Sequence, residues 1–203
     1  MRPTIAVVDH GAGNLVSIGQ GLARAGADIV MATAPSDLVG VDSVVLPGVG
    51  ATRTVMDGID AAGMRGPLTD LDVPLFGICV GMQVLFDSSD EDDAECLGLI
   101  PGVVRKLRNT PSLPHIGWND LTIERPDPLF ESVPDEPVYF VHSYAPEPTD
   151  PSTVVATSEH GERFVAAVRS GAVSGTQFHP ERSGRVGLAI MANVVAAASR
   201  VNA

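Results

Sequence analysis

The first half of the chain alternates short apolar runs with helix-like stretches. The helix-like stretches cover residues 15–25, which Gly26 follows, and residues 52–62. Apolar runs typical of β-strands cover residues 4–8, 28–32, 43–46 and 74–78. Apolar strands that alternate with helices predict a parallel sheet covered by helices on both faces.

Three glycine-bearing segments follow predicted strands, and such sheets place their sites beyond the carboxyl ends of the strands. The segments are Asp9–Asn14, Pro47–Gly50 and Gly77–Gly81.

The second half of the chain has shorter strand patterns that Pro and Gly interrupt. We expect these strands as antiparallel additions to the sheet, at residues 138–141, 154–157, 164–168 and 173–178. A helix rich in Ala and Val is predicted for residues 187–201. Segment 87–95 holds six carboxylates in nine residues, and we expect a solvated loop there rather than a metal site. The prediction is one doubly wound α/β domain over residues 1–203.

The composition of the chain argues against several classes of function. The formal charge of −12, from 25 acidic and 13 basic residues, disfavours binding to nucleic acid or to an anionic membrane. No apolar run reaches the roughly 18 residues of a membrane span, and the N-terminus leads straight into a strand pattern without a signal peptide. The two cysteines, Cys79 and Cys96, form no disulfide framework. We therefore expect a cytoplasmic protein.

The segment Gly77-Ile-Cys79-Val-Gly81 has the form of a nucleophile elbow with Cys in place of Ser. A nucleophile between a strand and a helix sits on a tight, strained turn, so small residues must flank it at −2 and +2. The following helix directs its N-terminus at the sulfur, which favours the thiolate. The N–H of Val80 is then free to stabilise an oxyanion. The alternative is a buried structural cysteine.

A cysteine nucleophile needs a base, and the sequence offers five histidines: His10, His115, His142, His160 and His179. His179 follows a strand pattern, and Glu181 lies two residues beyond it across a proline that restricts the backbone. Such a turn can direct Glu181 at one ring nitrogen while the other faces the thiol. A loop histidine beside a surface glutamate would have the same spacing.

Together, Gly77–Gln83 and Gln177–Glu181 resemble the motifs of class I glutamine amidotransferases. Within that class, further segments resemble the glutaminase subunits of imidazole glycerol phosphate synthase, which serve histidine biosynthesis. These segments are Asp9–Leu15, Leu46–Gly50, Pro114–Asn119, Tyr139–Tyr144 and Gly175–Gly184.

The resemblance implies a mechanism without metal or cofactor. Cys79 attacks the carboxamide of glutamine, His179 carries the proton to departing ammonia, Glu181 orients His179, and water hydrolyses a thioester. The same resemblance implies an oxyanion hole of Val49, Gly50 and Val80. It implies substrate binding by Gly48, Gln83, Ser143 and Tyr144, although Gln83 could also be an ordinary first-turn helix residue.

The resemblance also implies a heterodimer with a (β/α)₈-barrel cyclase that receives the ammonia. Candidate residues for the partner face are Asn14, Trp118, Asn119, Tyr139 and Arg182. Trp118 could equally be a core residue. The family usually has Lys at the position of Arg182 and an aromatic residue shortly after Gly50, where this chain continues Ala51-Thr-Arg53.

Three other functions fit parts of the pattern. One is a glutaminase subunit for anthranilate, aminodeoxychorismate or pyridoxal phosphate synthesis, which would share the elbow and the His-Pro-Glu motif. The second is a stand-alone cysteine hydrolase on a related sheet, and the third is a non-catalytic interaction module.

Overall fold

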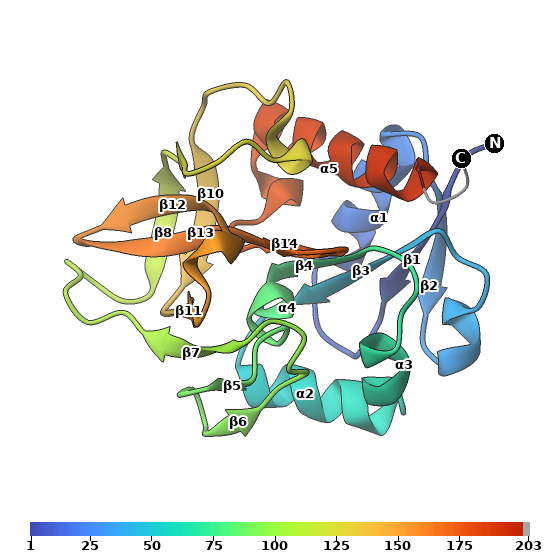
Figure 1. Ribbon diagram of the computed structural model, residues 1–203, viewed down its shortest axis with the longest axis horizontal. Coiled ribbons are helices and arrows are strands. Elements are labelled where there is room, and N and C mark those ends of the chain that lie inside the picture. Colours follow the sequence, from blue (N-terminus) through green and yellow to red (C-terminus); the bar gives the residue numbers. More distant parts are fainter. Residues whose placement is uncertain (201–203) are drawn as a thin grey trace.

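The computed structural model describes residues 1–200 and is built on an eight-stranded sheet (Figure 1). Its order is β2-β1-β3-β4-β14-β13-β12-β9, parallel as far as β14 and antiparallel beyond it. The strands are β1 (Thr4–Val8), β2 (Asp28–Ala32), β3 (Ser43–Gly48), β4 (Leu75–Cys79), β9 (Thr122–Ile123), β12 (Val154–His160), β13 (Glu162–Ser170) and β14 (Val173–Thr176).

Helices cover both faces of the parallel part. Helices α1 (Leu15–Arg24) and α5 (Gly184–Ser199) lie on one face, and α2 (Thr52–Ala61) and α3 (Arg65–Thr69) lie on the other (Figure 1). Because side chains on both faces of β3 and β4 are covered, every residue of these strands is buried. The predicted α/β class, with antiparallel strands in the C-terminal half, is confirmed. The remaining short helices are α4 (Val80–Gln83), η1 (Pro35–Leu38), η2 (Pro128–Phe130), η3 (Pro151–Thr153) and η4 (Pro180–Arg182).

Two smaller sheets lie beside the main one, and one of them corrects an expectation. Strand β10 (Val138–His142) pairs with β8 (His115–Asn119) and not with the main sheet, where the sequence placed residues 138–141. The other sheet has the order β11-β7-β5-β6, and in it Tyr144 pairs with Lys106. Its strands are β5 (Ser88–Ser89), β6 (Ala94–Glu95), β7 (Gly102–Lys106) and β11 (Tyr144–Pro148).

The acidic segment 87–95 is ordered as a short hairpin in which residues 90–93 form the turn, and five of its six carboxylates are exposed, so their expected solvation is confirmed. It forms the β5–β6 pair, and Ser89 and Ala94 are buried. Its Glu91 carboxylate accepts hydrogen bonds from the N–H and hydroxyl of Thr52, at 2.8 and 3.0 Å. The segment thus holds the first turn of α2 in place. The C-terminal helix begins three residues before its predicted start, and Val201, at its predicted end, lies outside the described residues.

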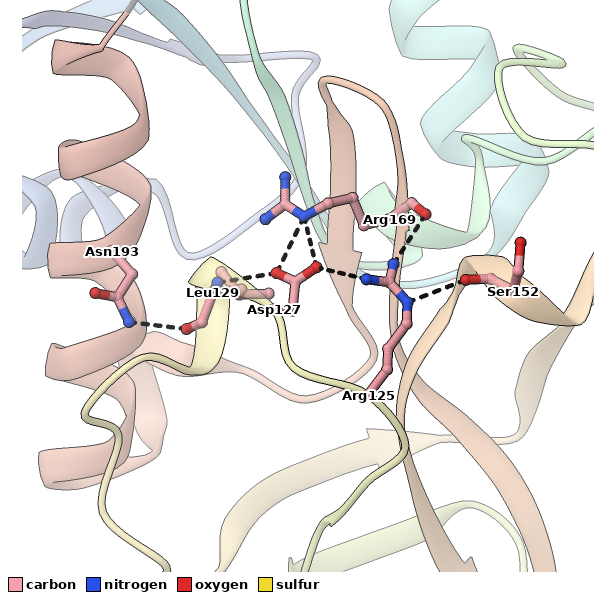
Figure 2. Close-up of polar contacts among 6 residues, drawn as sticks. All are labelled: Arg125, Asp127, Leu129, Ser152, Arg169 and Asn193. Atoms are coloured by element: carbon pink, nitrogen blue, oxygen red, sulfur yellow. Dashed lines mark hydrogen bonds and ion pairs between the residues drawn. The ribbon is translucent and has the colours of Figure 1, made fainter.

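A buried ion cluster joins the antiparallel strands to the helical layer (Figure 2). The fully buried Asp127 carboxylate accepts from Nε of Arg169 at 2.8 Å and from Nη1 of Arg125 at 3.3 Å. It also caps η2 by accepting from the N–H of Leu129 at 2.9 Å. Asn193 of α5 donates to the carbonyl of Leu129 at 2.9 Å. The Asp127 carboxylate thereby joins β13 to η2, and Asn193 joins η2 to α5.

Candidate active site

A cavity of about 260 Å³ opens where β3 and β4 end. This is the edge of the sheet at which the glycine-bearing segments predicted a site. The residues that line it are Val49, Gly50, Cys79, Val80, Gln83, Glu91, Pro114, Val141, His142, Ser143, Tyr144 and His179.

Cys79 lies on a strained turn at the end of β4, with φ 55° and ψ −113°. Such a conformation costs a non-glycine residue about 1–3 kcal/mol and persists only where the surroundings enforce it. The surroundings leave no space for side chains on either side of it. A Cβ on Gly77 would lie 2.6 Å from the carbonyl oxygen of Gly81, and a Cβ on Gly81 would overlap the carbonyl of Leu46. The small flanking residues expected of an elbow are therefore required by packing.

The helix after Cys79 is shorter than the elbow pattern suggests. Helix α4 is a single turn, Val80–Gln83, so its contribution at the sulfur comes from individual N–H groups rather than from a long aligned dipole. The N–H of Val80 opens this turn, where backbone donors have no partner within the helix. Val80, Val49 and Gly50 all line the cavity beside Cys79.

His179 and Glu181 lie on the turn that contains η4, directly after β14. Nδ1 of His179 lies 2.9 Å from Oε1 of Glu181, and both side chains are almost wholly buried. Because a carboxylate accepts at Nδ1, that nitrogen carries the proton and Nε2 faces other partners. Nε2 is buried and makes no hydrogen bond of standard geometry within residues 1–200. The structure thus brings Cys79, His179 and Glu181 together as the sequence predicted.

The charges around His179 favour its protonated form. Burial by itself lowers the pKa of His179, but the close contacts with Cys79 and Glu181 and the attraction to both outweigh burial and raise the pKa to about 10. An imidazolium at this position can stabilise negative charge that develops on Sγ of Cys79.

The other four histidines bond to carbonyl oxygens or to another imidazole. Nε2 of His10 lies 2.7 Å from the carbonyl oxygen of Pro47, at the start of the glycine loop. Nδ1 of His115 lies 3.2 Å from Nε2 of His142. His160, the fourth, stacks on His115 at a centroid distance of 4.1 Å. These contacts are structural supports, so His179 is the histidine paired with a carboxylate among the described residues.

The opposite wall of the cavity carries polar groups that suit an amino acid. Nε2 of the buried Gln83 donates to the carbonyl oxygen of Tyr144 at 2.9 Å and to Oε1 of Gln177 at 3.0 Å. Gln83 is therefore part of the cavity wall and not a solvent-facing helix residue. Ser143 also lines this wall.

Glu91 is a cavity residue that the sequence did not single out. One of six carboxylates in a short acidic run carries no signal of its own, because only the β5–β6 turn brings it to the cavity. Gly48, in contrast, was predicted to bind substrate and does not line the cavity. It packs at the end of β3, where a Cβ would overlap the backbone N of Gly81.

Several predicted partner-face residues form one surface patch. Trp118 is 57% exposed, so its placement as a core residue is wrong. Its ring lies 6.0 Å from that of Tyr139, its partner across the β8–β10 ladder. The guanidinium carbon of Arg182 lies 4.2 Å from the Tyr139 ring centroid. Tyr139 in turn lies 6.5 Å, ring to ring, from His179.

The two remaining predicted residues make other contacts. Asn119 donates from Nδ2 to the carbonyl oxygen of Glu159 at 2.5 Å. Asn14 precedes α1 as its N-cap residue, without a side-chain cap bond.

Within the described part of the chain, no group of three or more His, Cys, Asp or Glu side chains is placed to hold a metal ion. No described helix is both long and apolar enough to cross a membrane. Cys79 and Cys96 are both free thiols.

Comparison with known proteins defines the family. The glutamine amidotransferase class I family matches residues 6–197. The chain therefore belongs to the class I glutamine amidotransferases, and it is an enzyme of that class. Within the class it belongs to the HisH subunits of imidazole glycerol phosphate synthase. The HisH subunit of Halobacterium salinarum is 48% identical over 204 residues, covering 95% of this chain and 92% of its own. That of Synechococcus sp. strain JA-3-3Ab is 46% identical over 199 residues, covering 94% and 92%.

Solved structures support the fold. A GMP synthase protein from Thermoplasma acidophilum superposes with a TM-score of 0.78 at 22% identity, over 100% of this chain and 96% of its own. PurLQS from Thermotoga maritima superposes with a TM-score of 0.68 at 21% identity, over 100% of both chains. The family match and the HisH relatives confirm the resemblance seen in the sequence motifs.

Proposed function

We propose that the chain hydrolyses L-glutamine to glutamate and ammonia at Cys79, with His179 and Glu181 completing a triad. The observation that carries this proposal is the buried His179–Glu181 contact of 2.9 Å beside a strained cysteine. A carboxylate that fixes Nδ1–H leaves Nε2 as the proton-transfer atom toward Cys79 and the substrate.

The first half-reaction starts from the thiolate–imidazolium pair. Sγ of Cys79 attacks the δ-carbonyl carbon of glutamine, and the carbonyl oxygen becomes an oxyanion. The N–H of Val80 and an N–H of the Val49–Gly50 segment are the donors for that oxyanion, and removing one such donor typically costs about 10²–10³ in turnover. The intermediate collapses as His179 gives its Nε2 proton to the leaving nitrogen. The C–N bond breaks, ammonia departs, and a γ-glutamyl thioester and a neutral imidazole remain.

The second half-reaction restores the enzyme. Neutral His179 takes a proton from water as the water oxygen attacks the thioester carbon. Collapse of this second intermediate breaks the C–S bond and releases the γ-carboxyl group of glutamate. The sulfur leaves as thiolate and His179 is again an imidazolium, stabilised by Glu181.

Substrate recognition is assigned to the opposite wall of the cavity. The amide of Gln83 uses its nitrogen for Tyr144 and Gln177, which leaves its oxygen as an acceptor for the substrate. Glu91 contributes a carboxylate to the same wall, and its Oε1 is not engaged by Thr52. We assign the α-ammonium group of glutamine to these acceptors and its α-carboxylate to backbone donors of the Ser143–Tyr144 segment.

The ammonia is used by a second protein, for which we propose a (β/α)₈-barrel cyclase. Free solution would protonate and dilute ammonia, so the two subunits must form a heterodimer with an enclosed path. In histidine biosynthesis the cyclase would make imidazole glycerol phosphate and an aminoimidazole carboxamide ribonucleotide. This step is the lyase half of the reaction. The exposed Trp118–Tyr139–Arg182 patch beside His179 supports this face as the docking surface. Two free thiols suit the reducing cytoplasm.

The decisive experiment compares glutamate formation by the chain alone and with the cyclase of the same genome, with and without its nucleotide ligand. We expect slow turnover alone and fast turnover in the liganded complex. Fast turnover that ignores the cyclase would indicate a stand-alone hydrolase. Capture of a chorismate-using enzyme instead of a barrel cyclase would assign the chain to another amidotransferase.

A further inference from the structure

The hydrogen-bonding network around Cys79 includes a side chain for which the triad gives no role. Gln177, directly after β14, is fully buried. Its Nε2 lies 3.6 Å from Sγ of Cys79, within hydrogen-bonding distance for sulfur. A buried carboxamide is costly unless its polar atoms are bonded, so its contacts determine where it can lie.

The network fixes which end of the Gln177 amide faces the sulfur. Gln83 donates from Nε2 to Oε1 of Gln177 at 3.0 Å. The oxygen of Gln177 therefore faces Gln83, and its NH₂ group faces Cys79. The flipped amide would place two NH₂ groups together and direct an oxygen lone pair at the sulfur, so the network excludes it.

Hydrogen bonds on both sides of Gln177 fix the position of the strand end that carries it. The N–H of Gln177 donates to the carbonyl of Ala166 at 2.8 Å, and the neighbouring hydroxyl of Thr176 donates to the carbonyl of Phe178 at 3.0 Å. The strand end is thus anchored on both sides of Gln177, and its side chain reaches Cys79 from a rigid support.

Besides His179, two polar groups face the sulfur, and they favour opposite protonation states of Cys79. The carbonyl of Val141, 3.9 Å from Sγ, can only accept a hydrogen bond and so favours the thiol. The amide of Gln177 can donate, and a donor to an anion is worth more than a donor to a neutral group. Gln177 therefore favours the thiolate over the thiol.

We propose that Gln177 is a further catalytic residue, whose side-chain N–H stabilises the Cys79 thiolate both before attack and when sulfur leaves the thioester. This inference rests on the proposed role of Cys79. Through Gln83, the same amide connects the nucleophile to the wall that receives the substrate. The chain of contacts runs from Sγ of Cys79 through Gln177 and Gln83 to the carbonyl of Tyr144.

The test uses the full chain and needs no glutamine. The rate of Cys79 alkylation by iodoacetamide is followed against pH by mass spectrometry of the Cys79 peptide. Digestion with chymotrypsin, which cleaves after Phe86, puts Cys79 and Cys96 on separate peptides. Burial raises the pKa of the Cys96 thiol to about 11. In Gln177→Met, which keeps the volume but lacks the donor, the midpoint of the profile should rise by about one pH unit. Gln177→Glu, with a carboxylate at the sulfur, should raise it further.

Thr176→Val is the matched control, because it removes a buried hydroxyl from the same strand end without touching the sulfur. Its profile should coincide with that of the parent chain. In the complex, Gln177→Met should lower kcat about tenfold and leave KM for glutamine within about twofold.

Two results would overturn the inference. One is a Gln177→Met profile that coincides with the parent profile. The other is an equal shift in Thr176→Val, which would indicate a general loosening of the strand end. If Gln177→Met does not fold, Gln177→Leu, which also lacks the donor and buries no polar group, gives the same information. A failure of the proposed function looks different, since the parent complex would then not hydrolyse glutamine, or a Cys79→Ala variant would still do so.

Discussion

Oε1 of Glu181 lies 2.9 Å from Nδ1 of His179, and the two residues are separated only by Pro180. The contact is short in sequence and buried in the fold, which sets the tautomer and the direction of the imidazole. Replacement of the carboxylate should therefore affect proton transfer more than substrate binding.

We expect Glu181→Gln to lower kcat for glutamine hydrolysis on the order of 10²–10⁴-fold, with little change in KM. Steady-state kinetics of the complex measure this. Glu159→Gln, at an exposed position on β12, is the control and should behave as the parent chain. A KM effect without a kcat effect would place Glu181 in binding rather than in orientation.

Cys79→Ala should abolish glutaminase activity and leave synthesis by the cyclase from added ammonium salts intact, because the partner performs that step. Coupled assays with glutamine or ammonium as nitrogen source separate the two. Cys96→Ala, at the other buried cysteine, should keep both activities. Persistent glutamine hydrolysis by Cys79→Ala would rule out Cys79 as the nucleophile.

The raised pKa of His179 predicts a protonated ring at neutral pH. NMR of the imidazole should show His179 charged at pH 8 in the parent chain, since its pKa is about 10. Because Cys79 is one of the groups that raise it, the pKa should fall in Cys79→Ala. The contribution to the free energy of unfolding is fully present below pH 6.5 and is lost as the pH rises toward 10. A His179 ring that titrates at its ordinary value in both proteins would contradict the ion pair.

The low pKa values of His115 and His142 predict that the folded chain loses stability in acid. Burial lowers the pKa of His115 to about 4 and that of His142 to about 3, so both are neutral in the folded chain near neutral pH. The unfolded chain binds these protons first, so the free energy of unfolding should fall as pH drops from 6.5 toward 4. Urea midpoints against pH measure this. His115→Phe should flatten that fall, and an unchanged slope would assign the acid loss to other groups.

The ion cluster around Asp127 predicts that Asp127 contributes more to the free energy of unfolding than Asp150, which also caps a short helix. Asp127→Asn should lower the free energy of unfolding by about 2–3 kcal/mol, because it leaves two partly buried arginines without their counter-charge. Asp150→Asn is the matched control. Asp150 caps η3 as Asp127 caps η2, but it is exposed and holds no arginine in the described contacts, so its loss should cost about 1 kcal/mol or less. Equal effects would show that capping, and not the ion cluster of Figure 2, accounts for the stability.

Local patterns predicted the parallel half of the fold well. The bounds of β1 and β2 match the predicted runs, although β1 is almost wholly buried and β2 is a partly exposed edge strand. A short apolar run bounded by turn residues was enough to predict each of them. The pairing of β10 with β8 was not predictable, since it joins segments whose partners are about twenty residues apart or more and depends on tertiary packing. Cys79, His179 and Glu181 lie in local motifs. Gln177 lies in the same motif as His179, but its contact with Cys79, like the approach of Glu91 to the cavity, arises only when distant strands meet.

The pairing of Lys106 with Tyr144 has a practical consequence. Lys106 is the only lysine in the chain, and its side chain is exposed. An amine-reactive fluorophore at high pH therefore has two targets, this side chain and the N-terminus. Since Tyr144 lines the cavity and lies opposite Lys106 in the ladder, a dye at Lys106 sits one strand away from the substrate wall. The native chain thus offers a built-in attachment point for an optical probe of ligand binding.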